Sequence, residues 1–274
     1  LIDGINVGYD GIQIEGTSNH LTVKNTEVKN CKNMGINLGP DANYQTLQNV
    51  KVSNVGTSGG VAGFDPGQAH AIYIPSKFNV VDHATIFNIT GYGVHIYNGY
   101  SGKTTDYNTV QSCNIQNVGT YKVGGSSTAA GILISRGSGN KALGNTLSNN
   151  PYNIKLYNGS LNGLAEGNQC SASQNPESIL ITSGASGSVV KNNCVDPAKV
   201  VNQGSNSTLS NNTLTGCSGS TPPPAPTNMD VTQQTQPPVY QTSPTSQPSG
   251  PSTSQVAVPF LIAGVLVAAL VLGD

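Results

Sequence analysis

Three of the chain's four histidines and four of its eleven tyrosines fall within one stretch, HAIYIPSKFNVVDHATIFNITGYGVHIYNGY, from His70 to Tyr100. Imidazole rings exchange protons near neutral pH, and phenol rings can donate a proton or stack on sugars. The chain has no tryptophan, and only 9% of its residues are charged. The stretch is therefore either a working site or the aromatic outside of a repetitive structure.

The stretch is part of a repeated pattern of short apolar segments. The segments GIQIE, GINLG, AIYIP, GVHIY, GILIS, NIKLY and SILIT have equivalent apolar residues at 12, 36, 72, 94, 132, 154 and 179. The steps are 24, 36, 22, 38, 22 and 25 residues, so a unit of 22 to 25 residues is lengthened twice. Pairs of apolar residues five apart, such as Val23/Val28, lie between these segments, and asparagines follow at 30, 54, 88, 117 and 149.

A fixed period of this size predicts a solenoid, because one repeat cannot bury its own apolar side. Alternating apolar residues in short β-branched runs favour strands, so we expect two or three strands per turn, each parallel to its copy in the next turn. Stacked asparagines suit tight turns with left-handed backbone. The segments, the asparagine column and HAIYI…GYGVHIY resemble the right-handed parallel β-helix proteins of the pectin-lyase-like superfamily. The predicted fold class is all-β, with a right-handed parallel β-helix domain over residues 1–217.

The composition changes after Cys217. Residues 218–255 are rich in Pro, Ser, Thr and Gln and predict a disordered stalk, because such a segment cannot bury a core. Residues 256–273 are apolar, and only Asp274 follows. Two interpretations stay open: a GPI-attachment signal or a transmembrane segment. The first is favoured, because a transmembrane segment usually carries Lys or Arg on its cytoplasmic side and none is present here. We therefore expect a domain outside the cell, anchored to the membrane at the cell surface.

Alternation along the strands places several polar side chains on one face. If residues 72, 74, 94 and 96 point into the coil, then Tyr73, His95 and Tyr97 point outward, toward solvent. Lys155 and Tyr157 are expected on the same face, with Arg136, the only arginine, just past the end of its strand.

The lengthened repeats place their extra residues, 55–69 and 118–130, just before the outward strand, and 98–108 follows it on the other edge. Loops rising on both edges predict a groove that holds a long ligand, and tyrosines can stack on sugars. The predicted substrate-binding residues are Tyr97, Tyr157, His70, Asp65 and Tyr100. The expected partner is a polysaccharide. Nucleic acid is not expected, because the chain has no basic patch, and the chain is expected to be a monomer.

Uronate lyases and epimerases remove the proton beside a carboxylate, which requires a base and a cation. His95 and Tyr73 are the candidate base and acid, and Arg136 and Lys155 the candidate cations. GFDPGQAH resembles the Asp-Pro-His element of mannuronate epimerases at Asp65 and Pro66, although Gly67 stands where that family has His.

Hydrolysis by paired carboxylates, as in polygalacturonases, ranks lower because the aspartates at 65, 82 and 106 are scattered over loops. A non-catalytic cell-wall or adhesion module is the other alternative. No metal site or cofactor is expected. Calcium is possible, but clustered aspartate ligands are not evident, and the five cysteines contain no C-x-x-C motif.

Cys170 and Cys194 lie 24 residues apart, one repeat, and can face each other on successive turns. Two interpretations stay open: a disulfide between them, or two small core residues.

Overall fold

The computed structural model describes residues 1–3, 9–56, 68–121 and 127–215, all within one compact unit, Leu1–Asn228. The stalk, the apolar segment 256–273 and Asp65 lie outside the described residues. The stalk and the anchor therefore stay predictions. Among the described residues, no helix is both long and apolar enough to cross a membrane.

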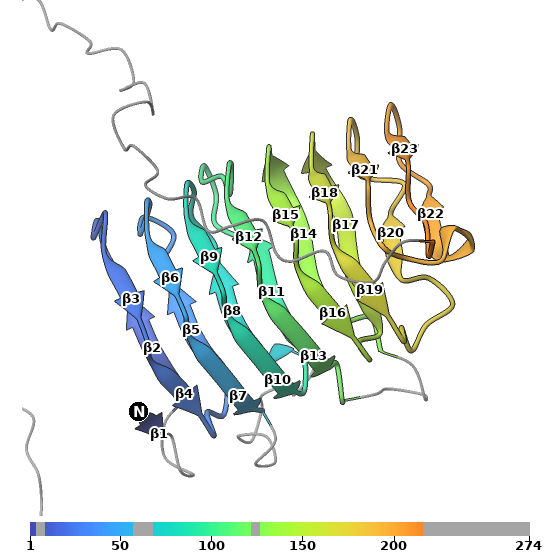
Figure 1. Cartoon of the computed structure of the whole chain (residues 1–274). Coiled ribbons are helices and arrows are strands. Elements are labelled where there is room, and N and C mark those ends of the chain that lie inside the picture. The colour runs from blue at the N-terminus through green and yellow to red at the C-terminus, as the bar shows by residue number, and fades with distance from the viewer. Residues whose placement is uncertain (4–8, 57–67, 122–126, 216–274) are drawn as a thin grey trace, which may run out of the picture. The chain divides into compact units, whose positions relative to one another are not determined.

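Three parallel sheets form the coil, and each turn contributes one strand to each sheet, except the last turn, which contributes only β22 and β23 (Figure 1). Sheet A holds β1 (Ile2–Asp3), β4 (Glu27–Lys29), β7 (Lys51–Val55), β10 (Thr85–Ile89), β13 (Asn114–Val118), β16 (Thr146–Ser148) and β19 (Gln169–Ser171). Sheet B holds β2 (Asp10–Ile14), β5 (Met34–Leu38), β8 (His70–Ile74), β11 (Tyr92–Tyr97), β14 (Ala130–Ser138), β17 (Tyr152–Leu161), β20 (Ile179–Ile181) and β22 (Val200–Asn202). Sheet C holds β3 (Thr22–Lys24), β6 (Thr46–Gln48), β9 (Val80–Asp82), β12 (Thr109–Gln111), β15 (Lys141–Leu143), β18 (Leu164–Glu166), β21 (Val189–Lys191) and β23 (Thr208–Ser210). A turn of 3-10 helix, Pro197–Lys199, precedes β22.

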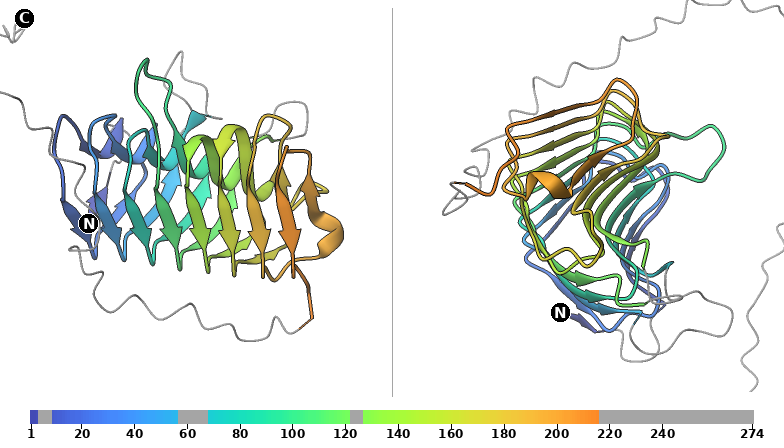
Figure 2. Two further views of the ribbon diagram at one scale, coloured as in Figure 1. Left: turned by 90° about the horizontal axis from the view of Figure 1, so that it is seen from above. Right: turned by 90° about the vertical axis from the view of Figure 1, so that its right-hand side faces the viewer.

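The predicted register of sheet B is confirmed. Ile36 pairs with Ile72, Ile72 with Val94, and Val94 with Ile132, and the pairing continues through Ile154 and Ile179. The strands therefore superpose when the coil is viewed along its axis (Figure 2). The architecture is a parallel β-helix with three strands per turn.

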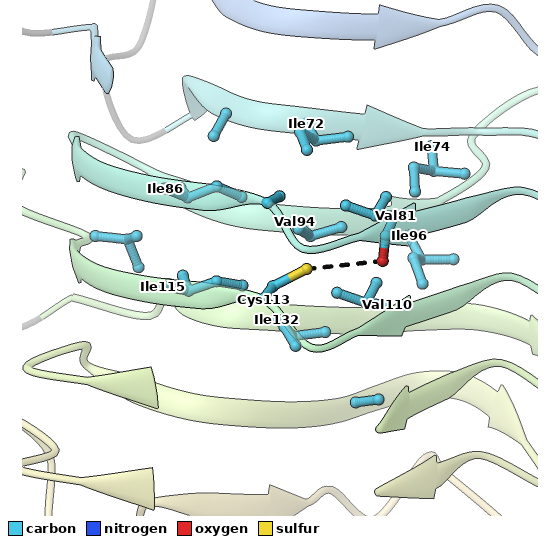
Figure 3. Packing of buried hydrophobic residues seen from close by; sticks show 14 of the residues in the cluster. Ile72, Ile74, Val81, Ile86, Val94, Ile96, Val110, Cys113, Ile115 and Ile132 are labelled. Atoms are coloured by element: carbon cyan, nitrogen blue, oxygen red, sulfur yellow. Dashed lines mark hydrogen bonds between the residues drawn. The ribbon is translucent and has the colours of Figure 1, made fainter. Parts of the chain in front are cut away.

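Branched aliphatic side chains from all three sheets fill the coil. Ile72, Ile86, Val94 and Ile115 are fully buried and lie in neighbouring rows (Figure 3). Since each turn adds an equivalent residue to each row, the core continues along the whole coil. The stabilisation comes from this shared burial, at roughly 25 cal/mol per Å² of apolar surface removed from water.

The turns between strands require left-handed backbone. The predicted asparagine column adopts it, with φ values of 58°, 55°, 57°, 53° and 53° at residues 30, 54, 88, 117 and 149. A second column of turns holds Asn25, Asn49 and His83, with φ values of 52°, 51° and 53°. His83 is therefore a turn residue.

A second set of asparagines lies inside the coil and was not predicted. Asn79, Asn108 and Asn140 are fully or almost fully buried on successive turns. Asn108 donates from Nδ2 to the carbonyl of Ser76 at 2.9 Å, and its Oδ1 accepts from the backbone N–H of Asn79 at 2.9 Å. The amide of Asn108 therefore bonds backbone groups of the turns that the sheets leave without partners, whereas Nδ2 of Asn79 donates to the side chains of Ser76 and Asn108.

Cys170 is a free, buried thiol, whereas Cys194 is disulfide-bonded. The two are therefore not bridged to each other. The backbone N–H of Cys170 donates to the carbonyl of Cys194 at 2.9 Å, so the one-repeat spacing places them on adjacent turns, as expected.

Asn108→Ala should lower the free energy of unfolding by about 3 kcal/mol, because it leaves buried donors and acceptors on the neighbouring turns without partners. Urea unfolding followed by circular dichroism measures this change. Asn49→Gly is the matched control: Asn49 is exposed with φ 51°, and Gly144 and Gly167 occupy equivalent turns. An equal loss of stability in both variants would contradict the role assigned to the buried amides.

Candidate functional site

The outward face of sheet B carries the aromatic residues. In β11, Val94 and Ile96 are fully buried in the core, so His95 and Tyr97 lie on the opposite face. Tyr73 of β8 pairs in register with His95, as the alternation predicts.

Alternation breaks at the start of each of these strands. Ala71 and Ile72 are both fully buried, and Gly93 precedes the buried Val94. A side chain at Gly93 would collide with Ile115 of sheet A, because an added Cβ would lie 2.9 Å from its Cγ2. Because two successive residues face the core in each strand, the residue that precedes them lies on the outer face instead of the inner one.

That residue is His70 in β8 and Tyr92 in β11, which pair in register. The ring of His70 stacks on Tyr73 at 5.2 Å between centroids, and Tyr92 stacks on His95 at 4.8 Å. Both rings therefore join the outward face. Strict alternation would place Tyr92 in the core, on the same side as Val94, and so does not predict it on the outer face.

Five rings form what we call the ring cluster: His70, Tyr73, Tyr92, His95 and Tyr97. His95 lies between Tyr92 and Tyr97, with interplanar angles of 29° and 12°. It meets the edges of His70 and Tyr73 at centroid distances of 4.8 and 5.6 Å. Nδ1 of His95 lies 3.4 Å from Nε2 of His70.

The histidines of the cluster are buried, which corrects the expectation that His95 faces solvent. His95 is 8% exposed and His70 is 3% exposed, because the surrounding rings cover them. Burial lowers the pKa of His70 to about 3, and the nearby backbone of Ala69 only partly opposes this shift. Burial, together with the charge His70 would carry, holds the pKa of His95 well below 6.5. Both imidazoles are therefore neutral at neutral pH.

The pKa of Tyr73 changes in the opposite direction from those of the two histidines. Burial raises the pKa of its phenol, and the neighbouring Tyr100 and Tyr97 add to the effect. The hydroxyl of Tyr73 is therefore protonated at neutral pH beside a neutral imidazole.

Arg136 reaches the cluster from the next turn. It has φ 74° at a bulge between Ser135 and Gly137, where the pairing of β14 with β17 shifts. Bulges re-aim side chains, and here the guanidinium carbon lies 5.1 Å from the ring centroid of Tyr97. Its Nη1 donates to the carbonyl of Asn98 at 3.1 Å.

Lys155 lies farther along the same face. Leu133 stands between His95 and Lys155 in the register, so the two are two turns apart, roughly 9.6 Å at the usual strand spacing. Its Nζ lies 4.5 Å from the ring centroid of Tyr152 and 4.9 Å from that of Tyr157. Burial lowers the pKa of Lys155 against the opposing charge of Glu177.

The remaining predicted site residues divide into two groups. Tyr157 and Tyr100 are exposed, at 43% and 54%, and Tyr100 is close enough to affect the pKa of Tyr73. Asp65 and most of the loop 55–69 lie outside the described residues, so the predicted groove stays a prediction.

The fold thus brings together Tyr73, His95 and Arg136, with Tyr97 between the last two, and keeps Lys155 apart. Within the described ranges, no group of three or more His, Cys, Asp and Glu side chains is placed to hold a metal ion. Tyr92 and Tyr152 were missed as members of this face. For Tyr92 the available signal was the column of small residues at 35, 71, 93 and 131, which marks the paired inward positions. In β17 the equivalent inward residue is Asn153, so the column does not reveal Tyr152.

The free energy of unfolding should fall as the pH falls below about 6.5, because the folded chain resists protonation of His70 and His95 while the unfolded chain does not; for His70 this loss continues to about pH 3. Each histidine contributes up to about 1.4 kcal/mol per pH unit. Urea unfolding at pH 7, 6 and 5 should show a shallower pH dependence in the double variant His70→Gln/His95→Gln. Equal slopes in the two proteins would contradict the buried, neutral state.

Comparison with known proteins gives a family and similar folds. The family model described as "Right handed beta helix region" matches residues 4–129 and 70–222. No curated protein matches the chain. Among solved structures, the A-module of mannuronan C-5 epimerase AlgE6 from Azotobacter vinelandii has 15% identity and a TM-score of 0.48, covering 75% of this chain and 50% of that one.

The AlgE4 A-module of the same organism has 13% identity and a TM-score of 0.47 over 74% of this chain and 50% of its own. PfbA, a surface adhesin of Streptococcus pneumoniae, has 13% identity and a TM-score of 0.41 over 78% and 62%. The chain thus spans about half the length of the two epimerase modules. The family match covers more than half of the chain and agrees with the three parallel sheets, and the chain belongs to the right-handed β-helix family.

Proposed function

We propose that this β-helix binds an acidic polysaccharide along the outward face of sheet B. The observation that carries the proposal is the placement of two cations against tyrosine rings on one face: Arg136 on Tyr97, and Lys155 between Tyr152 and Tyr157. Sugars stack on aromatic faces, and carboxylates pair with cations held beside them.

The two cations are suited to different contacts. Arg136 is exposed and can form paired hydrogen bonds with a carboxylate. Lys155 is only 8% exposed, so a ligand carboxylate above it meets a charge that little water screens. The exposed ring of Tyr157 beside it offers a stacking surface.

A repeating polymer suits a repeating face. The contacts recur along the coil, on β11, β14 and β17, which are successive strands of sheet B. Several weak contacts on successive sugar units add without requiring a deep cavity. If the segment 256–273 anchors the chain as predicted, this face is displayed at the cell surface.

Binding of polygalacturonate or polymannuronate, measured by calorimetry, should weaken by roughly tenfold in Arg136→Gln and by roughly two- to tenfold in Tyr157→Ala. The affinity should fall with added salt, because the attraction is between charges. Lys141→Gln, which removes an exposed lysine of sheet C, and neutral dextran are the controls. Unchanged affinity in both site variants would refute this binding face.

A second candidate function is proton transfer at C5 of a uronate, as in a lyase or C5-epimerase. One observation favours it: the ring of Tyr73 lies 5.6 Å from that of His95, which places a protonated phenol beside a neutral imidazole. Burial lowers the pKa of His95 and raises that of Tyr73, so each group has the required form but is a weaker base or acid than the free side chain. Arg136 would neutralise the sugar carboxylate while the proton beside it is removed. The burial of His95 requires that the rings above it move aside for this chemistry.

Turnover is tested by incubating the full chain with uronic-acid polymers in D2O. Epimerisation should place deuterium at C5, and elimination should produce ultraviolet-absorbing unsaturated ends. His95→Gln and Tyr73→Phe should each lower kcat/KM by about a hundredfold or more, since each removes a proton-transfer group. Tyr157→Ala should mainly raise KM. Retention of the full rate in His95→Gln would exclude this chemistry but leave the binding proposal intact.

A further inference from the structure

Four asparagines of the chain stand in the sequence Asn-x-Ser/Thr, which is the acceptor motif for N-linked glycans. They are Asn88, Asn158, Asn206 and Asn211, and all four residues are exposed. Each therefore satisfies the sequence rule. A glycan also needs a side-chain nitrogen that the folded coil does not already use, and the four amides differ in this respect.

Two of the amides belong to the asparagine stacks of the turns. Nδ2 of Asn88 donates to Oδ1 of Asn54 on the preceding turn at 3.3 Å, and Nδ2 of Asn211 donates to Oδ1 of Asn192 at 3.3 Å. Asn88 also has Asn117 at the equivalent position of the following turn. A sugar on either nitrogen would disturb its stack, and at Asn88 it would have to fit between turns about 4.8 Å apart.

The amide of Asn158 lies against the next turn of the coil. An added Cβ at Gly184 would lie 2.2 Å from Oδ1 of Asn158, so the amide covers the backbone of that glycine. Ser160, the hydroxyl residue of this motif, is fully buried. A glycan at Asn158 would also stand next to Tyr157, on the face proposed to bind polysaccharide. The fold therefore disfavours a glycan at this position.

Asn206 differs because the preceding turn offers it no stacking partner. Gly187 occupies the equivalent position of that turn, and a glycine has no side chain to contact the amide. Among the described residues, the side chain of Asn206 makes no hydrogen bond. Asn206 directly precedes β23, the last described strand of sheet C, at one end of the coil (Figure 1). Its nitrogen and the space beside it are therefore open.

A cysteine gives an independent indication of the compartment in which the chain folds. Cys194 is disulfide-bonded, and it lies in register with Thr213, two residues after Asn211. Disulfides form and persist in oxidising environments such as the lumen of the endoplasmic reticulum. N-linked glycans are attached on the same secretory route, so the bond and the motif indicate one environment.

We propose that Asn206 carries an N-linked oligosaccharide at this end of the coil. The bond that forms joins Nδ2 of Asn206 to C1 of the first sugar. The bond that breaks joins C1 to a phosphate oxygen of a lipid-linked diphosphate donor, and the amide loses one proton as the diphosphate leaves. The modification does not depend on polysaccharide binding, and its test measures no binding.

The test uses the full chain, exported by a eukaryotic cell behind a cleavable signal peptide. Peptide-N-glycosidase F in ¹⁸O water converts each formerly glycosylated asparagine to a labelled aspartate, and mass spectrometry reports the four positions separately. We expect label at Asn206 in most of the exported chains and at Asn88, Asn158 and Asn211 in a minority. No label at Asn206, or equal label at all four positions, would overturn the proposal.

Thr208→Ala removes the hydroxyl that the motif at Asn206 requires and should abolish the label there. Ser210→Ala is the matched control, because it removes an exposed hydroxyl from the same strand, outside any acceptor motif, and should leave the label unchanged. Circular dichroism checks that both variants fold. Label that persists in Thr208→Ala would contradict enzymatic attachment at this motif. If Thr208→Ala is not exported, the labelling pattern of the unchanged chain still decides.

Discussion

Parallel stacking of equivalent strands about 4.8 Å apart is the constraint on which the rest of this structure depends. Each side chain on a turn meets the side chain at the equivalent position above and below it. Similar residues therefore recur at equivalent positions, because a side chain that packs well against its copy in one turn packs equally well against the copy in the next. The turn column His20, Tyr44, Phe78 and Tyr107 shows this directly, with interplanar angles of 14°, 6° and 8°.

The same constraint governs the polar groups. The amide of an asparagine has one acceptor and one donor side, so it can accept from one turn and donate to another. Asn145, Asn168 and Asn193 do this in the interior, each amide donating to the next at 2.9 Å. A buried row of amides is tolerable only because the repeat satisfies every member. A single interruption would leave polar groups unpaired on both sides.

The fold and the outward face could be predicted largely from the sequence, because periodicity reports inward and outward positions. The pairing of Tyr73 with His95 followed from counting residues. Exposure could not be predicted that way: His95 points outward and is still buried, because Tyr92 and Tyr97 cover it. Counting residues also could not predict where the side chain of Arg136 points, because its direction depends on a local bulge in β14.

The ring cluster departs from the stacking that dominates elsewhere. In the turn column the rings lie nearly parallel at 4.8 to 5.4 Å, which is what stacked turns produce on their own. His70 and His95 instead meet edge to face, and they do so because the small residues Ala71 and Gly93 admit two successive inward positions that bring His70 and Tyr92 to the outer face. A regular strand would have placed His70 in the core, away from His95. The close approach of the two nitrogens is therefore a product of a local irregularity in an otherwise regular coil, and irregularities of this kind are where a repetitive scaffold can acquire a site.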